Sequence, residues 1–185
     1  MGCMVSLALV HYPVYNKAGD VIASAVSNLD LHDISRAAKT YGIKNFYVVT
    51  PLLDQQALVE RITAHWTQGR GSRYNPDRKK ALELIRIVAS LGEVVASLES
   101  QGQGRPLVVV TDAQSRGDSI SFDRCFQIVK TGVPVLLLFG TAWGLSRTII
   151  EAADYILEPI FGPTDYNHLS VRSAVAIVLD RFFGC

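Results

Sequence analysis

Two glycine-containing loops in the last third of the chain carry the residue types best suited to binding a small molecule. One loop lies in VLLLFGTAWGLS (Val135–Ser146), and the other follows YILEP in the segment Tyr155–Asp180, which then continues as an apolar helix. Gly140 and Gly144 carry no Cβ, so backbone amides and carbonyls there can face the edge of a ligand. Loops at the carboxyl ends of parallel strands commonly form ligand pockets.

The chemistry of these loops favours a ligand without phosphates. Neither loop contains lysine or arginine, and the glycine patterns of phosphate-binding loops are missing. Pro159, Gly162 and Pro163 hold the second loop out of regular structure. An irregular apolar loop suits an adenine ring held by backbone hydrogen bonds. The alternative for the first loop, an ordinary turn between strand and helix, remains open.

The elements that would position these loops alternate along the chain. Apolar runs predict strands at Val5–Val10, Asn45–Pro51, Arg105–Ala113, Val133–Gly140 and Asp154–Ile160. Helical spacing predicts helices within Leu29–Ile43, Ala57–Trp66, Arg78–Leu91, Ser121–Gly132, Thr141–Ala153 and Asn167–Phe183. Residues 92–100 are ambiguous and favour a short strand followed by a short helix. This alternation predicts an α/β fold, a mostly parallel sheet with helices on both faces.

Local signals refine these elements. Asp30 is a candidate N-cap, with Asp33 completing an approximate capping box, and Gly42 suits the end of the same helix. The polar segment Thr67–Lys80 predicts an exposed loop. Gly19 marks a turn in the polar loop after the first strand.

Composition limits the class of protein. The 185 residues predict one domain, residues 1–185, and a net charge of +1 says nothing about partners. Cys3, Cys125 and Cys185 show no metal or redox spacing and predict free thiols in a reducing cytosol. The first apolar run ends at His11, too early to span a membrane, and the start MGCMVS is a weak lipidation signal.

One local stretch is strongly basic. Between His65 and Arg86 lie Arg70, Arg73, Arg78, Lys79, Lys80 and Arg86, against only Asp77 and Glu83, with Trp66 and Tyr74 among them. Cations interleaved with aromatic rings are typical of RNA-binding surfaces, although a solvated helix face has the same composition. Residues 67–77 could also form a lid over a substrate.

Three segments resemble the motifs of the SPOUT family of knotted RNA methyltransferases. LLLFGTAWGLS resembles the family's glycine loop, EPIFG with HLSVRSA its final motif, and DLHDISRAAKTYG its first motif. The matching positions are Gly140, Thr141, Gly144, Leu145, Pro159, Ile160, Leu169, Val171, Ala174, Arg36, Ala38 and Gly42. The motifs occur in the family's order and together span nearly the whole chain.

The chain departs from the family pattern at several positions. Asp30 and His32 replace the asparagine and glycine of the first motif, and Ala142 or Trp143 stands where many members carry glutamate. Ser170 and Arg172 replace the asparagine and serine of the final motif. The chain is therefore more similar to the branch related to tRNA (guanine-N1)-methyltransferase than to a ribose methylase.

The resemblance carries expectations about fold, cofactor and partners. It implies a deep trefoil knot at the C-terminus, S-adenosyl-L-methionine as methyl donor, and a cytoplasmic homodimer acting on RNA, either tRNA or rRNA. It implies no metal and no membrane contact. A non-catalytic knotted domain that partners another methyltransferase is the alternative, and a Rossmann-type oxidoreductase is disfavoured because no G-x-G follows the first strand.

The resemblance also implies the cofactor-binding residues. They are Thr111, Asp112, Phe139, Gly140, Thr141, Ala142, Gly144, Leu157, Glu158, Ile160, Phe161, Gly162, His168, Leu169 and Val171. For Thr111 and Asp112 the alternative is a cap of the following segment.

Two residues are candidates for catalysis. The motif match makes Arg36 a catalytic or RNA-positioning residue, because a guanidinium can hold a phosphate through two hydrogen bonds; a surface ion pair with Asp33 is the alternative. Asp30, His32 and Asp165 could accept the proton of the methyl acceptor. Asp165 is preferred because it lies in the loop expected beside the methyl group.

Overall fold

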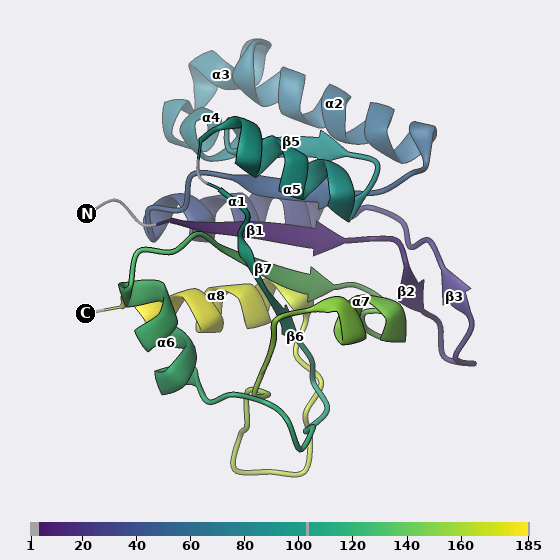
Figure 1. Cartoon of the computed structure of the whole chain (residues 1–185). Helices are drawn as coiled ribbons and strands as arrows, with labels where there is room; N and C mark the ends of the chain where they lie inside the picture. The colour runs from purple at the N-terminus through teal and green to yellow at the C-terminus, as the bar shows by residue number, and fades with distance from the viewer. Residues whose placement is uncertain (1–3, 103, 185) are drawn as a thin grey trace.

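The structure is a computed structural model that describes residues 4–102 and 104–184, and it is built on one parallel sheet (Figure 1). The sheet has six strands in the order β5-β4-β1-β7-β6-β8. Their bounds are β1 Val5–Val10, β4 Phe46–Val49, β5 Ile85–Val88, β6 Leu107–Thr111, β7 Val135–Gly140 and β8 Tyr155–Leu157. Every neighbouring pair is parallel, which confirms the predicted α/β fold.

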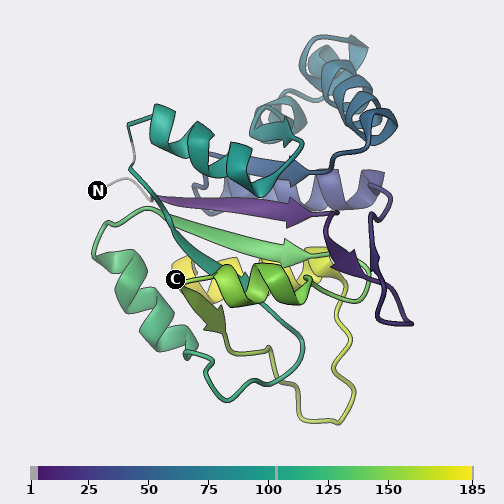
Figure 2. The same cartoon turned by 45° about the vertical axis from the view of Figure 1, so that its right-hand side comes forward.

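Helices cover both faces of the sheet (Figure 2). They are α1 Asn28–Thr40, α2 Leu53–Thr67, α3 Arg70–Tyr74, α4 Pro76–Leu82, α5 Leu91–Ser100, α6 Phe122–Lys130, α7 Arg147–Ala152 and α8 Val171–Phe183. Buried side chains of α1, α2, α4, α6 and α8 share one apolar core, and those of α5 and α7 share the other.

The two cores follow from the period of two along each strand. In β1, Leu7 and Leu9 belong to the first core, whereas Ala8 and Val10 belong to the second. All six residues of β1 are buried. A strand covered on both faces favours apolar residues throughout, which explains why Ser6 is the one polar residue of β1.

A small hairpin stands at the carboxyl end of β1. Strands β2 (Val14–Tyr15) and β3 (Val21–Ile22) pair antiparallel, and Gly19 adopts a φ of 88° in the turn between them. The sequence predicts the turn but not the strands, because two-residue strands have no measurable periodicity.

The region between β4 and β6 differs from the prediction. The expected loop at residues 67–80 contains α3 and most of α4. The expected helix Arg78–Leu91 is confirmed only as far as Leu82, because Ile85–Val88 forms β5 beside β4. The ambiguous residues 92–100 belong to α5, so the expected strand there is also wrong. Pairing with β4 outweighs the helical spacing of the apolar residues, since IRIV is rich in β-branched side chains.

The two ends of α1 differ in how well the sequence predicts them. Helix α1 begins after Ser27, so the prediction of Asp30 as N-cap is wrong, while Gly42 has a φ of 76° just beyond its end.

Cys125 is a buried free thiol whose pKa burial raises to about 11; Cys3 and Cys185 lie outside the described residues. Among the described helices, none combines the length and apolar character needed to cross a lipid bilayer.

Candidate functional site

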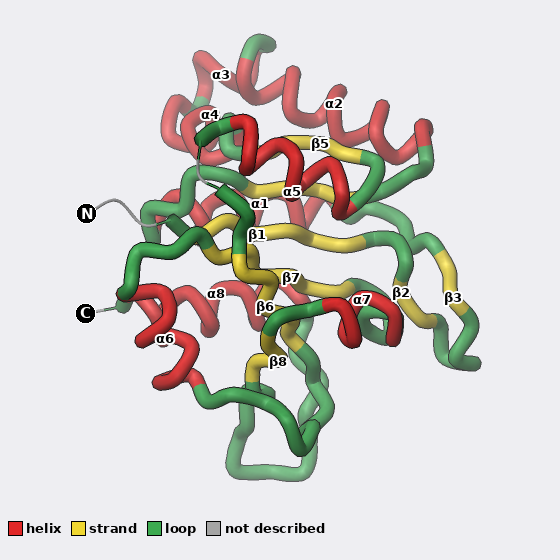
Figure 3. The backbone as a smooth tube through the Cα atoms, in the orientation of Figure 1, coloured by secondary structure: helices red, strands yellow, loops and turns green. Residues whose placement is uncertain are grey.

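The carboxyl ends of β6, β7 and β8 lie together at one edge of the sheet. Val110 is in register with Leu138 of β7 and Ile156 of β8, and Thr111 is in register with Leu157. The loops that leave these strands, residues 112–121, 141–146 and 158–170, therefore start side by side (Figure 3). The fold thus brings together three segments that the sequence assigns to one cofactor site.

The glycine loop after β7 needs its glycine at position 140. A Cβ at Gly140 would lie 2.7 Å from the backbone nitrogen of Leu145, much closer than real Cβ contacts. Ala142 has a φ of 52° and Gly144 a φ of 99°, and no atom lies within 4 Å of the position where Gly144 would carry a Cβ. The loop therefore folds back so that Leu145 packs against Gly140, while the space beside Gly144 stays open.

The hairpin strand β2 holds this loop in place. The Thr141 hydroxyl donates to the Val10 carbonyl at 3.0 Å. The Trp143 amide donates to the Tyr15 carbonyl at 3.0 Å, and the Tyr15 amide donates to the Gly144 carbonyl at 2.9 Å. These bonds fix the backbone of the loop before any ligand arrives, which lowers the entropic cost of binding.

A buried histidine extends this support. The His11 Nδ1 lies 3.0 Å from the Ser24 hydroxyl, which lies 2.5 Å from the Thr141 hydroxyl. Because Thr141 already donates to Val10, a consistent arrangement has His11 Nδ1 donating to Ser24 and Ser24 donating to Thr141. The His11 side chain is fully buried, and its Nε2 has no hydrogen-bond partner among the described residues.

The pKa of His11 reflects this burial. Desolvation lowers it to about 4, although hydrogen bonds at the backbone of Ser24 and Ala25 raise it. A neutral ring therefore supports the glycine loop at physiological pH. Sequence reasoning assigns no role to His11, and the only available signal was a polar residue directly after a buried strand.

The loop after β6 is organised by Asp112. One of its carboxylate oxygens accepts from the amide of Gln114 at 3.0 Å, and the other lies 2.7 Å from Nε and from Nη2 of Arg116. The Thr111 hydroxyl donates to the Leu138 carbonyl of β7 at 3.0 Å. Both side chains thus hold the local backbone, as the capping alternative expects.

The loop after β8 is tied to its neighbours by polar contacts. A Glu158 carboxylate oxygen accepts from the Phe122 amide at the start of α6 at 2.7 Å. The Asn167 side-chain amide donates to the Ala113 carbonyl at 2.8 Å and so joins this loop to the loop after β6. The Glu158 carboxylate is engaged with α6 and its amide donates to the Ile120 carbonyl at 2.9 Å, so its own carbonyl is the group left to meet a ligand.

The surface of the second loop is apolar and aromatic. Phe161 and Tyr166 are 62% and 74% exposed, and Trp143 of the glycine loop is 57% exposed. The ring of His168 lies 6.1 Å from that of Trp143 and 6.4 Å from that of Tyr166, measured between centroids. The two predicted loops therefore meet through aromatic rings, a surface that suits an apolar ring or a cationic ligand.

The side chains of the other predicted cofactor residues differ in their exposure to solvent. Phe139 and Leu157 are buried in the core, so a ligand could meet only their backbone. Ile160 and Val171 are partly buried against the same core. Leu169 and Gly162 are exposed.

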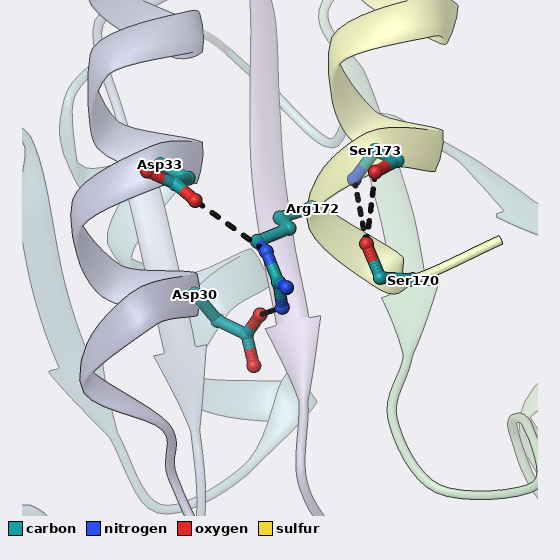
Figure 4. A network of polar contacts seen from close by, with 5 residues as sticks. All are labelled: Asp30, Asp33, Ser170, Arg172 and Ser173. Carbon is teal, nitrogen blue, oxygen red and sulfur yellow. Dashed lines mark hydrogen bonds and ion pairs between the residues drawn. The ribbon is translucent and has the colours of Figure 1, made fainter.

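Helix α8 begins at this edge and is fixed to α1 by an ion-pair cluster (Figure 4). Arg172 Nη1 lies 3.3 Å from Asp30 Oδ1, and its Nε lies 3.4 Å from Asp33 Oδ2. Ser170 caps α8, accepting from the Ser173 amide at 3.3 Å. Burial raises the pKa of Asp30, against the lowering effect of Arg172. Asp30 and Arg172, both departures from the family pattern, are therefore partners.

The two predicted catalytic residues lie in different surroundings. Asp165 lies in the exposed part of the loop between β8 and α8. Arg36 is exposed on α1 and lines a groove shared with α4, whose lining includes no residue of the three loops. The surface ion pair expected between Arg36 and Asp33 is not formed, since Asp33 pairs with Arg172.

The chain is similar in sequence to two relatives and in fold to one solved structure. It is 45% identical over 177 residues to a tRNA (guanine-N(1)-)-methyltransferase of Oleidesulfovibrio alaskensis, covering 96% of this chain but only 41% of that relative. It is 39% identical over 181 residues to a protein of Aquifex aeolicus, covering 97% of this chain and 88% of that protein. Its fold is similar to that of the SpoU methyltransferase AviRb from Streptomyces viridochromogenes in complex with the cofactor AdoMet, with a TM-score of 0.61, 20% identity, and coverage of 99% and 58% of the two chains.

The family model agrees with the motifs. The model of the SAM-dependent RNA methyltransferase family matches residues 4–184, and this match confirms the resemblance drawn from the three motifs. The chain belongs to the family of SAM-dependent RNA methyltransferases.

Proposed function

We propose that this chain transfers a methyl group from S-adenosyl-L-methionine to RNA. The observation that carries the proposal is the meeting of the loops after β6, β7 and β8 at one edge of the sheet, in a chain whose whole described length matches the family model. The relative from Oleidesulfovibrio alaskensis acts on tRNA by its name, so tRNA is the substrate we propose first and rRNA the second.

The residues at this edge suit such a cofactor. The open position at Gly144 and the exposed apolar side chains of Phe161 and Leu169 offer space and apolar surface to an adenosine. The rings of Trp143 and His168 offer faces to a sulfonium cation. When bound, S-adenosyl-L-methionine supplies an electrophilic methyl group on that sulfonium.

We propose that the residues predicted from the sequence form the cofactor site. Their surroundings in the structure suggest how each one contributes. Gly140, Thr141, Ala142 and Gly144 shape the glycine loop, in which the amides of Thr141 and Gly144 already donate to protein carbonyls. Phe161, Gly162, His168 and Leu169 present exposed surface. The remaining members, Thr111, Asp112, Phe139, Leu157, Glu158, Ile160 and Val171, act through backbone or hold the loops in place.

Asp165 is the proton acceptor that we propose. Its carboxylate is exposed in the loop after β8 and has no ion-pair partner among the described residues, so it can turn toward a bound nucleotide. Asp30 is less suitable because Arg172 holds its carboxylate. Arg36 positions RNA rather than the reacting atom, since it lies in the groove with α4.

We further propose that residues 1–185 form a single domain with a trefoil knot, working as a cytoplasmic homodimer. The support for a knot is the return of the chain from the edge strand β8 to α8, which packs beside α1 and α6, through a loop tied to residue 113. The motifs of the SPOUT family support the dimer.

Calorimetry with S-adenosyl-L-methionine and its demethylated product tests the cofactor site. Binding of both is expected, and no heat of binding at millimolar ligand would refute the proposal. A Gly140→Ala variant serves as the comparison, because its altered loop should weaken binding.

Transfer itself needs a second assay, with tritiated cofactor and undermodified total RNA. Labelled RNA is expected from the enzyme. Cofactor binding without label would support the non-catalytic alternative, for which the chain's coverage of only 41% of a named tRNA methyltransferase leaves room. An Asp165→Asn variant should bind cofactor normally and lose most of the transfer rate, as general base catalysis contributes roughly 10²–10⁴-fold.

A further inference from the structure

A polar cavity lies between α1 and α4, apart from the three loops. It has a volume of about 400 Å³, and its lining residues are Arg36, Lys39, Thr40, Asn75, Asp77, Arg78 and Ala81. We call it the α1–α4 groove. Three of the seven lining residues are cationic and one is anionic, so the groove carries a positive charge.

Within the part of the chain that the structure describes, the three cations that line the groove have no carboxylate partner, unlike the two lysines beside Arg78 on α4. Lys79 pairs with Glu83, and Lys80 pairs with Asp77 at 3.0 Å. Three other arginines, Arg116, Arg147 and Arg172, also pair with carboxylates. Among the described residues, no carboxylate lies within ion-pair distance of Arg36, Lys39 or Arg78.

Arg78 is held in the groove by packing rather than by charge. Its guanidinium lies 4.5 Å from the centre of the Trp66 ring. Its Nε is buried and has no hydrogen-bond partner among the described residues. A partly desolvated guanidinium without an acceptor is costly, and an anion entering the groove would relieve that cost.

The acidic residue of the groove does little to offset these cations. The Asp77 carboxylate accepts from Lys80, whose ammonium balances its charge. His32, which packs edge-on against Trp66 at 5.3 Å, responds to the surplus of positive charge. Burial lowers its pKa, and Arg78 and Arg36 lower it further, against the raising effect of Asp33.

We propose that the α1–α4 groove binds a backbone phosphate of the RNA substrate through Arg36, Lys39 and Arg78. The site is distinct from the cofactor site, because none of its lining residues belongs to the loops after β6, β7 or β8. It rests on the proposed function in taking RNA as the polyanion.

The neighbouring surface favours RNA over a small free anion. Arg70 and Arg73 are exposed on α3, directly before α4, and Tyr74 beside them is 87% exposed. A single phosphate would occupy only the groove, whereas a nucleic acid strand can continue from the groove across these cations and stack a base on Tyr74. The groove would thus hold the RNA at a distance from the transfer site and set its register.

The test removes two charges that support no other contact. Arg36→Gln with Lys39→Gln leaves Arg78 on Trp66 and should preserve the fold. Binding is measured by fluorescence anisotropy with a labelled, unmodified tRNA transcript over a range of KCl concentrations. The slope of log K against log[KCl] should become shallower by roughly 0.7–0.9, the change that counterion release gives for the loss of one phosphate contact. The affinity near 0.1 M salt should fall roughly tenfold.

Two control variants make the result specific. Arg36→Lys with Lys39→Arg retains both charges in the groove and should keep the wild-type slope. Lys17→Gln with Arg105→Gln removes two exposed charges elsewhere, from the hairpin turn and from the segment before β6, and should change the slope less. Thermal melting checks that all variants fold.

The outcomes separate this inference from the proposed function. A wild-type slope in the Arg36→Gln/Lys39→Gln variant, or an equal change in the Lys17→Gln/Arg105→Gln variant, overturns the groove as an RNA site even when calorimetry shows cofactor binding. Failure of the wild type to bind cofactor refutes the methyltransferase, whereas a slope change confined to the groove variant would still support the RNA site. Cofactor affinity should be the same in the groove variant and the wild type.

Discussion

At the scale of single residues, backbone conformation matters more than charge in the glycine loop. Gly140 has no room for a side chain, while Ala142 adopts a left-handed conformation that disfavours any side chain. We therefore expect alanine at position 140 to destabilise the protein, whereas glycine at position 142 should not.

Gly140→Ala should lower the free energy of unfolding by about 1–3 kcal/mol, as overpacking does, because its Cβ would meet the Leu145 nitrogen. Ala142→Gly should leave stability unchanged or raise it by up to about 1 kcal/mol, because relief of the left-handed strain offsets the added chain entropy. Urea unfolding of both variants measures the difference. Equal destabilisation by the two substitutions would contradict this account.

His11 makes stability depend on pH. Its folded-state pKa of about 4 lies below its ordinary value of 6.5, so the unfolded chain binds the proton first as pH falls. The stabilisation is therefore complete above pH 6.5 and is lost as pH falls toward 4, by roughly 3 kcal/mol in total. Urea unfolding across this range should show the loss in the wild type and a flatter profile in His11→Asn, whose amide can still bond Ser24. Parallel profiles would exclude His11 as the cause.

At the scale of elements, an ion-pair cluster joins α1 to the start of α8, beside the proposed cofactor site (Figure 4). Asp30 is only 12% exposed at its side chain and Arg172 is 36% exposed. A double-mutant cycle with Asp30→Asn and Arg172→Gln should give a coupling energy of about 0.5–1 kcal/mol, within the range for partly exposed pairs. Calorimetry should show weaker cofactor binding in each single variant. Additive effects on stability would show that the two side chains do not interact.

The sequence predicts an element correctly where its pattern of apolar residues fits only one kind of secondary structure. Continuous apolar runs gave β1 and β7 because both faces of these strands are covered. The helix predicted within Ser121–Gly132 is α6, and the Ser121 hydroxyl caps it by accepting from the Arg124 amide at 3.2 Å. By contrast, Leu82 and Ile85 fit a helix by spacing, and only the neighbour β4 decides that Ile85 lies in a strand. Asn75 followed by Pro76 is a typical start of a helix, and it marks α4 within the segment that the polar composition predicts as a loop.

For the candidate site, the sequence predicts which loops meet but not how their side chains are used. The parallel sheet places the ends of β6, β7 and β8 together whatever their side chains are. The pairing of Asp30 with Arg172 joins residues 142 positions apart, and no local pattern signals it. The bond from Phe122 to Glu158 likewise appears only after β8 and α6 are placed.

At the scale of the whole molecule, the proposed dimer makes a direct prediction. A chain of 20.3 kDa should sediment as a species of twice that mass at micromolar concentration. The exposed apolar side chains of Phe161, Tyr166 and Leu169 would give such a dimer apolar surface to bury. Sedimentation velocity on the wild type and on Phe161→Asp tests both points. A monomer at every concentration would refute the homodimer, and an unchanged dimer in Phe161→Asp would place its interface elsewhere.

The order of strands in the sheet also determines how the chain can fold during synthesis. Strand β1 lies between β4 and β7, and Val5 pairs with Val135. When a ribosome has released only the first half of the chain, β1 can pair with β4 but its other edge stays open until β7 emerges. An apolar strand with an open edge readily pairs with other chains. The N-terminal half of the chain should therefore aggregate more readily than the complete chain.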